Sequence, residues 1–174
     1  MAIVASKPKS EYSTAPEGLF AAVCCDVVDL GIQDTGFEGK KAHKVQVRWM
    51  LEETDPKTGK NYMVMRSFRL SLHEKASLRA ILESWRGRKF TAEELEGFDL
   101  EVLIGVNCQV QVIHNIKDGG ETYANVQAVV PPARNAVKMR VPDGYVRVVE
   151  REQRERLESD PFGTGAPADE DIPF

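Results

Sequence analysis

The alternation of apolar and polar residues in the first half of the chain predicts three β-strands. Gly18–Asp29 is dominated by β-forming residues and predicts a long first strand. Residues 30–43 contain three glycines and two adjacent lysines, which predict a flexible loop with a basic tip. Lys44–Glu52 alternates between two faces, and its apolar face holds Val45, Val47, Trp49 and Leu51. After a turn containing Pro and Gly, Tyr62–Leu70 predicts a third strand that closes a hairpin.

In the middle of the chain the apolar period changes to that of a helix. Apolar residues recur at helical spacing through Glu74–Trp85, and Gly87 ends the run. Thr91-Ala92-Glu93-Glu94 matches a capping box, so we expect a short helix over about Ala92–Glu96. A further helical turn is expected at Leu100–Ile104.

Strand pattern returns in Asn107–Ile116 and Tyr123–Val130, which Asp118-Gly119-Gly120 joins as a hairpin. The predicted order is three strands, a helical insertion and a two-stranded hairpin. This is the element order of an OB-fold, a five-stranded Greek-key barrel with its helix between strands three and four. We therefore predict an all-β OB-fold domain over residues 17–132.

The segments outside this domain have less apolar patterning. Residues 1–16 are polar and predict a flexible arm, and residues 133–158 predict an extension. Within the extension, Tyr145–Val149 has the pattern of a sixth strand, and Glu150–Glu158 is a charged run that favours a helix. Residues 159–174 are rich in Pro, Gly, Ala and Asp, and we expect a disordered acidic tail.

The tail also explains the net charge of −4. Residues 157–174 carry five Asp or Glu and no Lys or Arg, whereas residues 131–156 carry seven basic and four acidic residues. The remaining 130 residues are nearly balanced, with 16 basic and 18 acidic. A neutral body can bind nucleic acid through a local basic stripe, although composition alone does not point to one.

Composition and cysteine usage suggest a reducing cytoplasm. No apolar run is long enough to span a bilayer, and residues 1–7 do not resemble a signal peptide, so we expect no membrane partner. Three cysteines, two of them adjacent, form no disulfide framework.

The last six residues combine three carboxylates with an apolar tip: Asp169, Glu170, Asp171, Ile172, Pro173 and Phe174. A pocket with an apolar floor and a basic lip can hold the Phe174 ring together with its α-carboxylate. Pro173 restricts the backbone, and the carboxylates steer the tip toward basic surfaces. We expect a partner-binding tip here; an acidic tail that only aids solubility would not need Ile-Pro-Phe.

This tip resembles the tail of the bacterial single-stranded-DNA-binding proteins, which ends in several Asp followed by Ile-Pro-Phe. The resemblance covers six residues and implies that the tip recruits DNA replication, recombination and repair enzymes. The long Gly/Gln-rich spacer that is common in that family is absent here.

The body also has a family resemblance, carried by several short motifs: Asp29-Leu30-Gly31, Lys44–Trp49, Phe68–Glu74, Leu78-Arg79, Glu83–Thr91 and Gly97–Leu100. Together they span most of residues 16–132 and resemble a family of small phage and prophage replication-region proteins. The resemblance implies an OB-fold that binds single-stranded DNA in the cytoplasm of a bacterial host. The family is too diverged from the cellular proteins for DNA contacts to be transferred by position.

Candidate DNA-binding residues follow from the expected groove on strands two and three and their flanking loops. For phosphates, we predict Lys40, Lys41, Lys44 and Arg48, and for stacking or phosphates, Phe37, Tyr62, Arg66 and Phe68. Arg86 and Arg88 are predicted to flank the groove. Packing in the barrel is the alternative for each aromatic residue, and simple solvation is the alternative for each lysine.

Other chemistry finds little support in the sequence. Cysteines and histidines lack metal-ligand spacing, and no glycine loop has the sequence of a phosphate cradle, so we expect no metal, no cofactor and no enzyme. A nuclease built on the acidic pairs Asp26/Asp29 or Glu52/Glu53 is a distant alternative. A nearer alternative is an interaction protein whose tail competes for host enzymes while its barrel hardly binds DNA. The oligomeric state stays open.

Overall fold

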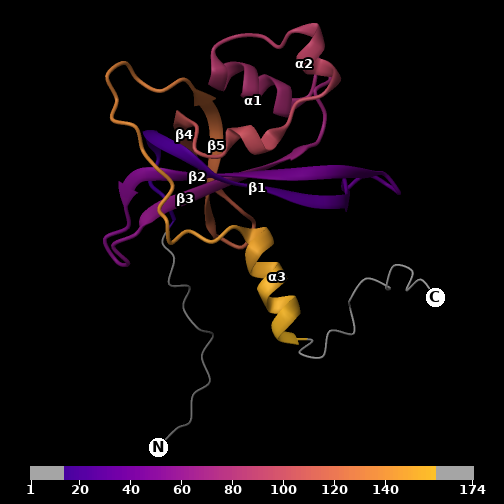
Figure 1. Ribbon diagram of the computed structural model, residues 1–174. Helices are drawn as coiled ribbons and strands as arrows, with labels where there is room; N and C mark the ends of the chain where they lie inside the picture. The colour runs from indigo at the N-terminus through magenta and orange to yellow at the C-terminus, as the bar shows by residue number, and fades with distance from the viewer. Residues whose placement is uncertain (1–13, 160–174) are drawn as a thin grey trace, which may run out of the picture. The chain divides into compact units, whose positions relative to one another are not determined.

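The computed structural model describes residues 14–159, and its main body is a five-stranded antiparallel sheet with short helices (Figure 1). The strands are β1 (Gly18–Asp34), β2 (Lys41–Thr54), β3 (Asn61–Arg69), β4 (Asn107–Ile116) and β5 (Thr122–Val130). Their order in the sheet is β3-β2-β1-β4-β5. The predicted all-β class and the five predicted strands of the domain are confirmed.

Strand β1 organises the sheet because it pairs with two neighbours. Its first part, Gly18–Val23, pairs with β4, and Ala22–Asp34 pairs with β2. Bulges shift the β1–β2 register after Cys24 and again after Asp29. Gly31 follows the second bulge with φ of 67°, a left-handed conformation that glycine adopts without strain.

The predicted loop over residues 30–43 is wrong in extent. Leu30–Asp34 and Lys41–His43 belong to the β1–β2 ladder, and only residues 35–40 connect the two strands. Cross-strand pairing overrides the weak strand propensity of this glycine-rich sequence, because each added pair satisfies backbone donors and acceptors.

The hydrophobic core lies between the inner face of the sheet and α1 (Ser77–Arg86). The predicted apolar face of β2 is buried, with Val45, Val47, Trp49 and Leu51 all at 3% exposure or less. Helix α1 adds Leu78, Ile81, Leu82 and Trp85. The rings of Trp49 and Trp85 lie 6.0 Å apart in a tilted arrangement, which joins helix and sheet.

Helix α1 ends as predicted at Gly87, whose φ is 71°. A Cβ at this position would lie 3.3 Å from Cγ of Pro131, so the helix end approaches the chain after β5 closely. The predicted capping box is also confirmed: Thr91 accepts from the Glu94 amide and begins α2 (Ala92–Glu96). The expected turn near residue 100 is a 3₁₀-helix, η1 (Leu100–Leu103).

The two edge strands of the sheet, β3 and β5, approach each other. Arg66 Nη1 in β3 donates to the carbonyl oxygen of Val126 in β5 at 3.2 Å. No backbone ladder between these strands is present in the described part of the chain, so the hydrogen-bonded sheet is open.

The boundary between two compact units falls between Val141 and Pro142. The stretch before it is tied to the first unit, because the Asn107 side chain exchanges two hydrogen bonds with the backbone of Met139, at 3.0 and 2.8 Å. At the other end of this unit, Ala15 is buried at 3% exposure.

In the second unit the prediction of a sixth strand at Tyr145–Val149 is wrong. Val148 begins α3 (Val148–Ser159), which includes the predicted charged helix. The Glu, Arg, Gln and Leu residues that follow are strong helix formers, and local hydrogen bonds such as Arg151 N to Arg147 O at 3.0 Å extend the helix backward. Residues 1–13 and 160–174, including the predicted partner-binding tip, lie outside the described residues. Among the described helices, none has the length and apolar character needed to cross a membrane.

Candidate nucleic-acid interface

The outward side of β2 and β3 carries a row of basic side chains. Alternation along β2 puts Lys44 and Arg48 opposite the buried Val45, Val47 and Trp49. Lys44 pairs in register with Arg69 of β3, and Arg48 pairs with Met65. Side chains of register partners lie on the same side of a sheet, so Arg69 joins the row. We call Lys40, Lys44, Arg48 and Arg69 the cation face.

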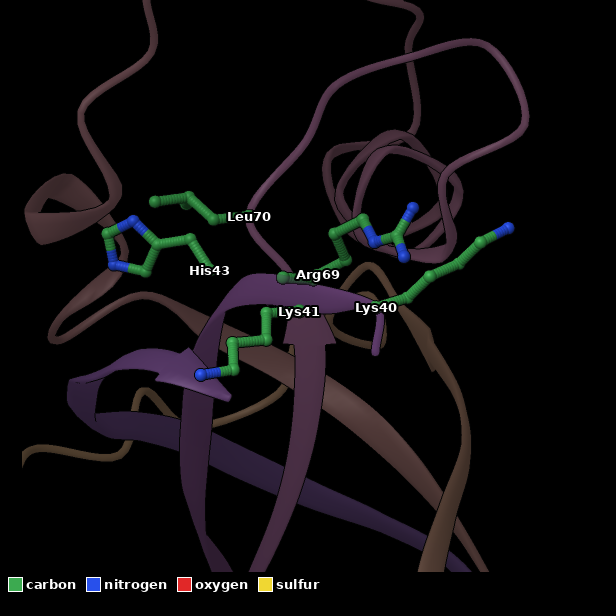
Figure 2. A pocket seen from close by; sticks show the side chains of 6 residues that line it. Lys40, Lys41, His43, Arg69 and Leu70 are labelled. Atoms are coloured by element: carbon green, nitrogen blue, oxygen red, sulfur yellow. The ribbon is translucent and has the colours of Figure 1, made fainter. Parts of the chain in front are cut away.

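One end of the cation face borders a pocket of about 460 Å³ (Figure 2). Lys40, Lys41, His43, Arg69 and Leu70 line it, together with Ala42. In Figure 2 Lys40 and Arg69 extend to one side of the view, and Lys41 and His43 extend to the other. Lys40 therefore lies on the same side as Arg69, whereas Lys41, its neighbour in sequence, points away from the cation face.

Asp29, which contacts the pocket residue His43, is already engaged. Asp29 Oδ1 lies 2.5 Å from His43 Nε2 and accepts from the Gly31 amide at 2.8 Å. The hydrogen bond from His43, followed by that from Gly31, holds the pKa of Asp29 below its usual value. Among the described residues, Lys40, Lys44 and Arg69 form no ion pair. They are thus free to meet an external anion.

Arg48 is held in place by its own strand. Its Nε donates to Gln46 Oε1 at 2.9 Å, and both side chains are half-buried. A cation whose position is fixed in this way loses less side-chain entropy when it binds a phosphate.

Two exposed aromatic residues lie at the turns between strands, one on the β1–β2 loop and one near the start of β5. Phe37, on the β1–β2 loop, is 73% exposed, as a base-stacking residue requires. Tyr123, at the β4–β5 hairpin, is 37% exposed, and Lys117 Nζ lies 4.3 Å from its ring centroid. The Tyr123 hydroxyl donates to Glu121, which raises the pKa of the tyrosine. In the sequence Tyr123 marks only the start of the predicted fifth strand, and its place across a tight turn from Lys117 is the signal that it belongs to the site.

A polar groove of about 420 Å³ lies where β3 approaches β5. Met65 and Ser67 contribute to it from β3, and they are the register partners of Arg48 and Gln46. The opposite wall contains three side-chain amides, from Asn115, Asn125 and Gln127. Since an amide both donates and accepts, this groove continues the cation face with groups suited to the edges of bases.

Three of the predicted residues belong to the inner side of β3. Phe68 is 2% exposed and is part of the core, so its ring has no free face for a base. Arg66 lies over the Phe68 ring, 5.0 Å from its centroid, and donates to β5, and it also lines the polar groove between the two strands. Tyr62 packs against the core, where burial and then Asp55 and Glu53 raise its pKa. Phe68 is therefore removed from the candidate site, and acidic neighbours make Tyr62 a poor phosphate contact.

Arg86 and Arg88 lie with the helices and not on the cation face. Arg86 forms a 2.7 Å ion pair with Glu94 and lies 4.7 Å from the Phe90 ring centroid, so it connects α1 to α2. Arg88 is exposed and lines a separate pocket beside Trp85.

Within the part of the chain that the structure describes, no group of three or more His, Cys, Asp or Glu residues could hold a metal ion. The three cysteines are buried, and burial raises the pKa of Cys108 to about 12 and that of Cys24 further. Of the carboxylates considered for a nuclease, Asp29 is engaged with His43, and Glu52 accepts from the Ala21 amide at 3.3 Å.

No protein-family model matches this chain, and no curated protein matches it significantly.

Proposed function

We propose that the first unit is an OB-fold barrel whose cation face binds single-stranded DNA. Support for the fold comes from the strand order, since an OB barrel pairs its first strand with both the second and the fourth and brings the third beside the fifth. The position of α1 between β3 and β4 is that of the OB-fold helix.

The observation that carries the proposal is the cation face itself, in which Lys40, Lys44 and Arg69 form no ion pair among the described residues. Lys44 and Arg69 sit opposite each other in adjacent strands, and Arg48 lies on the same side of β2 as Lys44. Lys40 extends to the same side as Arg69 (Figure 2). Like charges in register are unfavourable unless an anion lies between them, and a phosphodiester backbone supplies one.

Single-stranded rather than duplex DNA is favoured by the groups around these cations. Phe37 and Tyr123 offer exposed rings, which stack on the faces of unpaired bases, and the Asn115–Asn125–Gln127 groove beside them offers amides for the base edges. Several bases stacked or hydrogen-bonded in this way would give binding that tolerates many sequences.

The segment Asp169–Phe174 completes the proposal through its resemblance to bacterial single-stranded-DNA-binding proteins. It would recruit replication, recombination or repair enzymes to the DNA that the barrel holds. In the rival function, the segment competes for the same enzymes and DNA binding is unimportant.

Fluorescence anisotropy of a labelled oligo-dT with the full chain tests the proposal. With four phosphate contacts, log K should fall against log salt with a slope of about −3, since each contact on a single strand contributes about −0.7. Binding that is undetectable at low salt would refute it and leave the rival function. On an oligo-dT short enough to hold one copy, replacing Ile172 and Phe174 by alanine should leave this affinity intact.

A further inference from the structure

A second cavity lies on the helical side of the first unit, away from the cation face. Its volume is about 610 Å³, and α1, the chain around η1 and the residues after β5 enclose it. Its apolar lining consists of Leu82, Trp85, Phe98, Leu103, Val106, Pro131 and Pro132. Val106 is 41% exposed, so the apolar floor is open to solvent.

The charged residues that line this cavity are three cations and one carboxylate. Glu94 is paired with Arg86 at 2.7 Å, which leaves Arg88 and Lys138 without an ion pair among the described residues. The chain from Pro131 to Val141 adds Arg134 and Arg140 and contains no acidic residue. The cavity thus combines an apolar floor with a positive rim.

Arg86 also has an unused donor at this cavity. Its Nη2 donates to Glu94, whereas Nη1 is buried and has no hydrogen-bond partner. A buried guanidinium nitrogen without an acceptor is unfavourable, and a small movement of the Arg86 side chain toward a carboxylate in the cavity would relieve it.

We propose that this cavity is a binding site for an acidic peptide with apolar anchors, and that its occupant is Asp169–Phe174 of a second copy of this chain. The segment has the complementary chemistry, since three consecutive carboxylates precede Ile172, Pro173 and Phe174. The carboxylates meet Arg88, Lys138 and Arg86, and the Phe174 ring enters the apolar floor between α1 and Pro131.

The assignment of the occupant to a second copy rests on the proposed function. Copies that bind side by side on one DNA strand would bring the cavity of one copy close to the Asp169–Phe174 segment of its neighbour. Each copy offers one pocket and one segment, so the contact is head-to-tail and extends along the strand. The cation face is on the other side of the sheet from α1, so the two sites can be occupied together.

A labelled peptide of residues 164–174 tests the site without DNA. The receptor is the full chain with Ile172→Ala and Phe174→Ala, so that its own segment does not compete. We expect the peptide to bind, and to bind about tenfold more weakly to a receptor that also carries Arg88→Glu and Lys138→Glu, because opposite charges are replaced by like charges. Lys57→Glu with Lys60→Glu, in the β2–β3 turn, is the matched control: both residues are exposed, neither lines the cavity, and the charge change is the same.

Sedimentation velocity of the unsubstituted chain tests whether the segment in the cavity comes from a second copy. Self-association that rises with concentration and disappears with Ile172→Ala and Phe174→Ala supports the proposal. A chain that stays monomeric while the peptide binds would overturn it in favour of docking within one copy. Equal affinity for both charge-reversed receptors, or displacement of the peptide by oligo-dT, would overturn the site. Because the peptide assay contains no DNA, failure of DNA binding alone would not affect it.

Discussion

At the scale of single residues, Phe37 and Phe68 have the same side chain and opposite environments. Phe37 lies on the β1–β2 loop at 73% exposure, and Phe68 lies in the core at 2%. Arg69, next to Phe68, faces outward because consecutive residues of a strand point to opposite sides. One position along β3 therefore separates a residue of the core from a residue of the proposed DNA site.

Substitution of these two phenylalanines should separate binding from folding. Phe37→Ala should weaken oligo-dT binding by about 1–3 kcal/mol, the range for a lost base-stacking ring, and leave the melting temperature unchanged. Phe68→Ala should lower the free energy of unfolding by about 3–5 kcal/mol, because it leaves a cavity in the core. Anisotropy and denaturant unfolding measure the two effects, and weaker DNA binding by a fully stable Phe68→Ala protein would contradict the placement.

Arg69→Ala should weaken oligo-dT binding about fivefold and reduce the salt slope by about 0.7, as expected for one lost phosphate contact. Its side chain is exposed and has no ion pair among the described residues, so the melting temperature should not change. Lys57→Ala, in the β2–β3 turn at the other end of the hairpin, is the control and should bind normally. Equal losses in both variants would mean that only net charge matters.

At the scale of elements, the Glu94 carboxylate connects α1 to α2. Glu94 accepts from the Thr91 amide at 3.1 Å in the capping box of α2 and from Arg86 of α1 at 2.7 Å. These hydrogen bonds, the one from Thr91 first, lower the pKa of Glu94. A carboxyl group whose pKa is lower in the folded state contributes stability above its unfolded pKa.

Glu94→Gln should therefore lower the melting temperature at pH 7. The difference from the unsubstituted chain should shrink as pH falls from the ordinary glutamate value of 4.5 through the lowered folded pKa. Glu93→Gln, also in the first turn of α2, should have little effect. Thermal melts between pH 7 and pH 3 measure this, and a difference that stays constant over that range would contradict the role of the charge.

At the scale of the whole molecule, periodicity in the sequence was sufficient to predict the five strands, α1 and the α2 cap, because each depends on local spacing or capping. The length of the β1–β2 hairpin was not predicted, since it depends on pairing across strands and on a glycine at a bulge. Likewise, alternation within Tyr62–Leu70 defined two faces of β3 without saying which one is buried. The register of β3 against β2 decides this: it puts Arg69 on the cation face and Phe68 in the core.

The proposed function depends most on the cation face, and a comparison of two charge-reversed proteins tests it most directly. One carries Lys44→Glu and Arg48→Glu on the cation face, and the other carries Arg88→Glu and Lys138→Glu on the helical side, so the net charge is the same. Affinity for a short oligo-dT that holds one copy should fall by about 100-fold in the first, because two phosphate contacts are lost and replaced by repulsion, and by no more than about threefold in the second. Equal losses in the two proteins, with both melting like the unsubstituted chain, would contradict DNA binding on this face.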